Sequence, residues 1–339
     1  MTPRGCRWRR TRRVLVTMVT LAAIGLLPAC GDEPPPEGPL RIATTVAPLT
    51  SLVAAVAGPK AMITGLVPEG TNSHTFEPKP SAARTLAEAD VIFLNGLELE
   101  QPIDELAYQV GQDTTPIVRL ANEVLPESDW IYDFSFPRSG GKANPHLWTD
   151  PKLAKRYVEV IRDALAKRDG DNGPTYRANA ARLIARIGAF DAALTDATGT
   201  IPEADRKLLT YHDAYAYFAR DYGWTVIGAI QPSDFSEPSA KEVTRLIDQI
   251  RAERVPAVFG SEVFPSPVLR QIAEESGATY VDDLRDDDLP GDPGDARHSW
   301  LGLMRFDYVT MVEALGGDAS ALRAVPLRGL GRDTATYPQ

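Results

Sequence analysis

Short apolar, β-branched runs alternate along the chain with segments that have helical periodicity. The runs that predict strands form two groups of four, at 40–46, 62–67, 91–94 and 116–120, then at 207–211, 224–229, 256–260 and 278–281. The predicted helices include 48–56, 81–89, 212–222, 241–253 and 267–276. Strands that alternate with helices form parallel sheets covered on both faces. The pattern therefore predicts an α/β protein with two four-stranded lobes.

The middle of the chain predicts one long helix. Asp171-Asn172-Gly173-Pro174 is a stop-and-start signal, and Pro174 suits a first helical turn. A helical apolar stripe follows, made of Tyr176, Leu183, Ile187, Phe190 and Leu194. A helix of about 23 residues spans roughly 34 Å. We expect a rigid linking helix at 174–198 between an N-terminal lobe (40–173) and a C-terminal lobe (199–339); the alternative is a surface helix of one domain.

The N-terminus predicts an export signal. Six arginines and no acidic residue precede the apolar run 14–27, which is too short to span a bilayer as a permanent helix. The segment 26–31 resembles a bacterial lipobox, so we expect a signal peptide at 1–29 and lipidation of Cys30. The alternative is ordinary secretion with Cys30 as a free thiol, and residues 11–16 also resemble a twin-arginine signal. Residues 30–39 would tether the protein to the extracytoplasmic face of the cell membrane.

The composition and the net charge limit which partners and which reactive groups the protein can have. The 339 residues carry a formal net charge of −10, which disfavours a nucleic-acid partner. The two cysteines, Cys6 and Cys30, form no Cys-x-x-Cys pair, so a thiolate zinc site and a redox dithiol are excluded. Histidines, carboxylates and hydroxyls remain as the groups that could bind a ligand or react.

Three of the four histidines have distinctive surroundings. His74 follows a predicted strand in Asn-Ser-His-Thr-Phe-Glu-Pro, His146 lies in a loop within Asn-Pro-His-Leu-Trp-Thr-Asp-Pro, and His212 follows another strand in Thr-Tyr-His-Asp-Ala-Tyr. Ligands of open parallel sheets bind outside the carboxyl ends of the strands. Each histidine alone could be a hydrogen-bonded structural residue, although His74 and His212 lie where a ligand of such a sheet would bind.

These motifs resemble those of the cluster A-I solute-binding proteins, the metal-binding lipoproteins of bacterial zinc and manganese ABC importers. The resemblance spans 40–315 and includes Asn95-Gly96-Leu97-Glu98-Leu99-Glu100. It implies a buried four-coordinate metal site in the cleft between the lobes. The implied ligands are His74, His146, His212 and Asp282, with the neighbouring Asp283 as an alternative to Asp282.

The resemblance implies a monomeric binding protein that captures Zn²⁺ and delivers it to a permease, and it leaves room for a metallochaperone as a further partner. Manganese is the alternative cargo, although manganese-specific relatives typically replace the third histidine by Glu, and His212 is retained here. A zinc hydrolase would need an open coordination position, which a fourth ligand argues against, so we expect no enzyme.

Two further sequence features bear on the expected metal site. The segment 128–142 lacks the histidines that many zinc-selective relatives carry in a loop. His298 lies beside an acid-rich loop that includes Asp286, Asp287 and Asp288. It could receive metal near the mouth of the site, or it could be an incidental residue of a solvated loop.

Overall fold

The computed structural model describes residues 1–2, 38–111, 115–231, 238–261, 266–329 and 333–338. Residues 3–29 of the predicted signal peptide, Cys30 and most of the tether lie outside these residues. None of the helices in this part of the chain combines the length and the apolar character that crossing a membrane requires.

The first sheet has four parallel strands in the spatial order β2-β1-β3-β4. Its strands are β1 (Leu40–Thr44), β2 (Ala61–Gly65), β3 (Val91–Leu94) and β4 (Ile117–Arg119). The helices of this region are α1 (Ala47–Ala57), α2 (Pro80–Ala87), α3 (Gln101–Val110) and α4 (Leu120–Val124). Every residue of β3 is buried, as expected for a central strand with both faces covered.

The second sheet repeats this topology in the order β6-β5-β7-β8. Its strands are β5 (Lys207–Thr210), β6 (Thr225–Ala229), β7 (Ala257–Ser261) and β8 (Thr279–Leu284), and its helices are α7 (Ala216–Tyr222), α8 (Ala240–Glu253) and α9 (Pro267–Ser276). Ser239 begins α8 with a capping box, which explains why the helix starts there. The predicted α/β fold with two four-stranded parallel sheets is confirmed.

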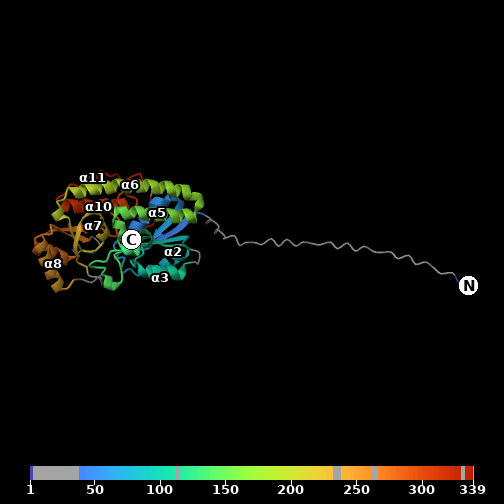
Figure 1. The fold of residues 1–339 in the computed structure, drawn as a ribbon, viewed down its shortest axis with the longest axis horizontal. Coiled ribbons are helices and arrows are strands. Elements are labelled where there is room, and N and C mark those ends of the chain that lie inside the picture. The colour runs from blue at the N-terminus through green and yellow to red at the C-terminus, as the bar shows by residue number, and fades with distance from the viewer. Residues whose placement is uncertain (3–37, 112–114, 232–237, 262–265, 330–332, 339) are drawn as a thin grey trace. The chain divides into compact units, whose positions relative to one another are not determined.

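A long helix spans the two halves. Helix α6 (Gly173–Gly199) has 27 residues and buries the predicted apolar stripe. It packs against α1 and α5 (Pro151–Arg168) from the first half, and against α10 (Trp300–Ala314) and α11 (Ser320–Ala324), which follow the second sheet. Figure 1 shows α6 lying along α5 and α10. The expected linking helix is therefore present.

The hydrophobic core is continuous between the halves. One buried cluster includes Ile42 and Phe93 of the first sheet, Phe190 of α6 and Phe259 of the second sheet. A smaller cluster lies on the other side of the second sheet, between β6, α8 and α9, and includes Ile227, Leu246, Ile250, Leu269 and Ile272. The two lobes thus share apolar packing instead of each having a separate core.

The end of the chain returns to the first sheet. Thr336 forms a parallel bridge with Thr64, donating from its N–H to the Ile63 carbonyl and accepting from the Gly65 N–H. The residues around Thr336 therefore lie beside β2, although the sequence pattern grouped them with the C-terminal lobe. Backbone pairing over such a separation leaves no periodic signal in the sequence.

Replacing Phe190 by Ala should destabilise the protein, because this side chain is fully buried where α6 meets Tyr308 of α10. We expect the free energy of unfolding to fall by about 3–5 kcal/mol, measured by urea denaturation. Asp196→Ala, at an exposed position of the same helix, is the matched control and should change stability little. A Phe190→Ala protein as stable as the control would contradict the continuous core.

Candidate metal centre

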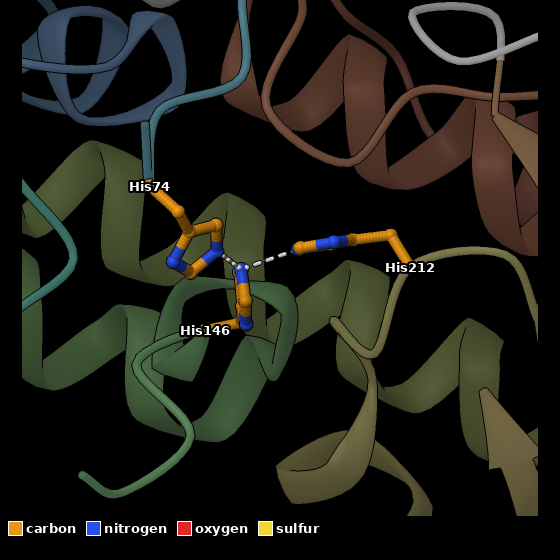
Figure 2. A group of neighbouring side chains, drawn as sticks. All are labelled: His74, His146 and His212. Atoms are coloured by element: carbon orange, nitrogen blue, oxygen red, sulfur yellow. Dashed lines mark hydrogen bonds between the residues drawn. The ribbon is translucent and has the colours of Figure 1, made fainter. Parts of the chain in front are cut away.

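Three histidines from distant parts of the chain meet at one point. His74 lies in the loop between β2 and α2, His146 lies just before the turn that leads into α5, and His212 follows β5 directly. Figure 2 shows the three imidazoles pointing toward one another from these segments. Their ligand atoms all lie within 4.8 Å of one another. The structure therefore brings together the three histidines that the sequence singled out.

The distances between the imidazole nitrogens suit a tetrahedral metal. His74 Nε2 is 3.2 Å from His146 Nε2, and His212 Nε2 is 2.9 Å from His146 Nε2. Zinc–nitrogen bonds of 2.0–2.1 Å at tetrahedral angles separate the ligand nitrogens by about 3.3 Å. Both separations from His146 Nε2 lie within a few tenths of an ångström of this value, and all three ligand atoms lie within 4.8 Å of one another, so a metal ion could bind among them after adjustment of the side chains.

The tautomer of His146 is set by Asn144. The Asn144 amide donates through Nδ2 to the Asp213 carbonyl and to Asp133 Oδ2, both at 2.9 Å. Its oxygen therefore faces His146 Nδ1, at 2.8 Å. Because an amide oxygen only accepts, Nδ1 carries the proton and Nε2 has a free lone pair. This is the tautomer that binds a metal through Nε2.

His212 is oriented in the same way. Its Nδ1 lies 3.0 Å from Gln231 Oε1, so Nδ1 donates and Nε2 has a lone pair. Two lone pairs then face each other between His146 and His212 at 2.9 Å. Such a contact is repulsive without a shared proton or cation. A metal ion between the nitrogens converts this repulsion into two bonds.

Burial disfavours the charged form of His74 and His146. His146 is fully buried and His212 almost so, whereas His74 is half-buried. Burial, followed by the charges of His212 and His74, holds the pKa of His146 well below 6.5. Burial, followed by the charges of His212 and Lys142, does the same to the pKa of His74. A neutral imidazole is the form that ligates a metal.

Carboxylates of the loop after β8 approach the histidines. Asp286 and Asp287 lie close enough to His212 for its charge to lower their pKa values, against the stronger raising effect of burial. Ser73, next to His74, donates to Asp287 Oδ2 at 2.5 Å, while the buried Oδ1 of Asp287 has no hydrogen-bond partner among the described residues. The Gly70 N–H donates to the neighbouring Asp288. These bonds hold the acidic loop against the loop that carries His74.

Asp282 does not join the histidines. Its side chain is 53% exposed and forms an ion pair with Arg270 of α9, with 3.1 Å between Nη2 and Oδ2. The predicted strand ended at residue 281, which placed Asp282 just beyond its carboxyl end. Strand β8 instead continues to Leu284, so Asp282 lies within it and the first residues beyond it are 285–287. The prediction that Asp282 completes the site is therefore corrected.

His298 lies outside the histidine group and is not a residue of a solvated loop. It is buried, with Nδ1 at 3.1 Å from the Gly291 carbonyl oxygen and its ring against Tyr337 at 4.6 Å between centroids. Its Nε2 faces Glu69 at 3.9 Å. These contacts give His298 a structural role between the acidic loop and the end of the chain.

A buried polar group supports the loop before His146. Asn95 Nδ2 donates to the Pro145 carbonyl at 2.9 Å, and Tyr157 donates to Asn95 Oδ1 at 2.8 Å. Glu100 in turn accepts from the Asn95 N–H and from the Thr45 hydroxyl. The sequence motif Asn95 to Glu100 thus acts indirectly, by fixing the backbone that presents His146.

The fold and the histidine site together indicate the class of protein to which the chain belongs. Two parallel-sheet lobes joined by a long helix, with buried histidines contributed by both halves, are the features of a two-lobed metal-binding protein. The model of the family described as zinc-uptake complex component A, periplasmic, matches residues 42–314. The chain belongs to this family, whose members are the metal-binding components of ABC importers.

Individual relatives bind different metals, according to their names. The manganese-binding lipoprotein MntA of Halalkalibacterium halodurans is 28% identical over 311 residues, which cover 90% of this chain and 99% of the relative. The iron-binding protein YfeA of Yersinia pestis is 27% identical over 304 residues, which cover 89% of this chain and 95% of the relative. The periplasmic zinc-binding protein TroA of Treponema pallidum has the same fold, with a TM-score of 0.75 and 24% identity. The match covers 82% of this chain and 99% of TroA.

Stability should depend on pH through Glu100. Burial raises the pKa of this carboxyl group from 4.5 to about 7. Its contribution to stability is therefore fully present below about pH 4.5 and is lost as the pH rises through about 7. The loss should amount to about 3 kcal/mol. Urea unfolding of metal-free protein between pH 5 and 8 should show this slope, and Glu100→Gln should remove it; parallel curves would contradict the assignment.

Proposed function

We propose that this protein captures Zn²⁺ outside the cytoplasmic membrane and delivers it to an ABC-type permease. The observation that carries the proposal is the pair of opposed Nε2 lone pairs on His146 and His212, with His74 Nε2 beside them. Amide oxygens hold the Nδ1 atoms of His146 and His212, so both rings present Nε2 to a cation. Family membership supports the transport role.

Asp287 is proposed as the fourth ligand in place of Asp282. In the part of the chain that the structure describes, its buried Oδ1 has no hydrogen-bond partner, and an uncompensated buried carboxylate oxygen is costly unless a cation neutralises it. Its Oδ2 is held by Ser73, one residue before His74, and the carboxyl group also feels the charge of His212. A turn of this side chain would bring one carboxylate oxygen to a metal held by the histidines.

The choice of zinc rests on the donor set. Three imidazoles and one carboxylate form a nitrogen-rich site, which suits Zn²⁺ better than Mn²⁺. Manganese is the second candidate, because MntA of Halalkalibacterium halodurans is named as manganese-binding and is similar over nearly its whole length. A complete sphere of four protein ligands is suited to holding an ion for transfer, not to activating a water molecule.

We propose that a lipid anchor keeps the protein at the cell membrane. Lipidation at Cys30 would anchor the protein on the extracytoplasmic face, and residues 30–39 would let a monomer reach the permease. Several relatives are named as lipoproteins, which supports this arrangement.

The proposed ligand set can be tested by comparing two aspartates. Asp287→Asn should weaken zinc binding by more than about 100-fold, which exceeds the loss typical of residues that only support a ligand. Asp282→Asn is the matched control and should bind zinc like the parent, because its carboxylate faces Arg270. Competition with a chelator of known affinity would measure both. The opposite order of the two effects would restore Asp282 as the ligand.

The cargo should be tested in cells, because zinc outcompetes manganese at most such sites in vitro. Loss of the gene should slow growth in zinc-poor medium, and zinc should restore growth. X-ray absorption of the loaded protein should show near-tetrahedral coordination with nitrogen distances of about 2.0–2.1 Å. Rescue by manganese, with no effect of zinc, would assign manganese as the cargo.

A further inference from the structure

A cavity leads from the surface of the first lobe to the histidine group. Its volume is about 240 Å³, and its lining includes His74, Leu97, Glu98, Phe136 and Lys142. At about 30 Å³ for each water molecule, this space is large enough for a divalent cation with its first hydration shell. His74 is also the half-buried member of the three histidines, so a cation in the cavity meets its imidazole first.

The backbone at the mouth of this cavity is strained. Gly96, Leu97 and Glu98 have φ angles of 86°, 50° and 61°, so two residues with side chains follow a glycine in the left-handed region. Leu97 donates from its N–H to Asn122 Oδ1, and the Leu99 N–H donates to the Gly96 carbonyl. Such conformations persist where surrounding contacts hold them, and they concentrate at functional sites.

This strained turn carries an ion pair at the rim. Glu98 Oε2 lies 3.1 Å from Lys142 Nζ, and both side chains are 52% exposed. Lys142 also donates to Gln101 Oε1 at 3.4 Å. The Lys142 ammonium repels a divalent cation that approaches His74, whereas the Glu98 carboxylate attracts it. The pair therefore places opposite charges on the path to the first histidine.

We propose that this cavity is the route by which the hydrated cation reaches the three histidines, with Glu98 as the carboxylate that receives it and Lys142 as the residue that restrains Glu98 in the metal-free protein. The inference rests on the proposed capture of Zn²⁺ by these histidines. Glu98 exchanges its lysine partner for the incoming cation, which then passes to His74 as water is replaced by imidazole. Glu98 acts during entry and is not a ligand of the final site.

This role predicts a kinetic effect without an equally large effect on affinity. A residue that stabilises the entering cation, but not the bound one, changes the association and dissociation rate constants by the same factor. Glu98→Gln should slow zinc association about three- to tenfold, because it leaves the lysine charge uncompensated. Lys142→Gln should accelerate association by a similar factor, because it frees the carboxylate. The dissociation constant should stay within about twofold in both variants.

Stopped-flow fluorescence can measure these rates in the full-length protein with Zn²⁺ alone. Trp148 provides a reporter, since its ring centroid lies 5.0 Å from that of His146. The matched controls are Arg323→Gln and Glu313→Gln, which disrupt an ion pair of similar exposure, 53% and 48%, away from the cavity. The differences between the Glu98 and Lys142 variants should shrink in 1 M salt, where charges are screened within about 3 Å.

The outcomes separate this inference from the proposed function. Slower association for Glu98→Gln and faster association for Lys142→Gln, with unchanged controls, would support the entry route. Normal zinc binding with unchanged rates in both variants would overturn the route and leave the proposed function intact. A large loss of affinity without a change in association rate would place Glu98 in the bound site and also overturn the route. A parent protein that binds no zinc would contradict both.

Discussion

The structure of the site depends on holding the Nε2 atoms of three imidazoles close together. The Nε2 atom of His146 lies 3.2 Å from that of His74 and 2.9 Å from that of His212, and the surrounding protein holds the rings at these distances. Asn144 and Gln231 do this by accepting the Nδ1 protons of His146 and His212, and Asn144 is itself fixed by two acceptors. The cost of this arrangement is offset when a cation binds, so the site is preorganised for metal.

The fold explains how such an arrangement is maintained. Both sheets direct their carboxyl ends toward connecting loops, and these loops supply His74 and His212. The long helix α6 and the continuous hydrophobic cluster join the two halves, which limits how far the ligands can separate. Hydrogen bonds between the His74 loop and the acidic loop after β8 provide a second connection beside the metal site.

The charged groups change in kind from the mouth of the cavity to the three histidines. An exposed carboxylate and ammonium pair, Glu98 and Lys142, lies at the mouth of the cavity. The three imidazoles follow, with the buried carboxyl groups of Asp286 and Asp287 close to His212. A cation that moves inward exchanges water for imidazole nitrogen while it approaches negative charge. This order of groups suits capture followed by retention.

The sequence alone determined the features that arise from local regularity. Alternating apolar runs located all eight strands, and the spacing of Tyr176 to Leu194 located the linking helix, because burial imposes a period on each element. The histidines were recognised because each stands in a motif at a strand end or before a helix. Their convergence was implied by the family resemblance, because His74 and His212 follow strands of different sheets and His146 lies in a loop.

Only the tertiary structure decided which acidic residues lie near the histidines. Strand β8 ends three residues later than the pattern predicted, so Asp282, which pairs with Arg270, lies within the strand, and Asp286 and Asp287 lie near His212. The burial of His298 likewise depends on contacts between distant segments. Strand ends and long-range contacts are set by packing between elements, and such packing leaves no period in the sequence from which it could be predicted.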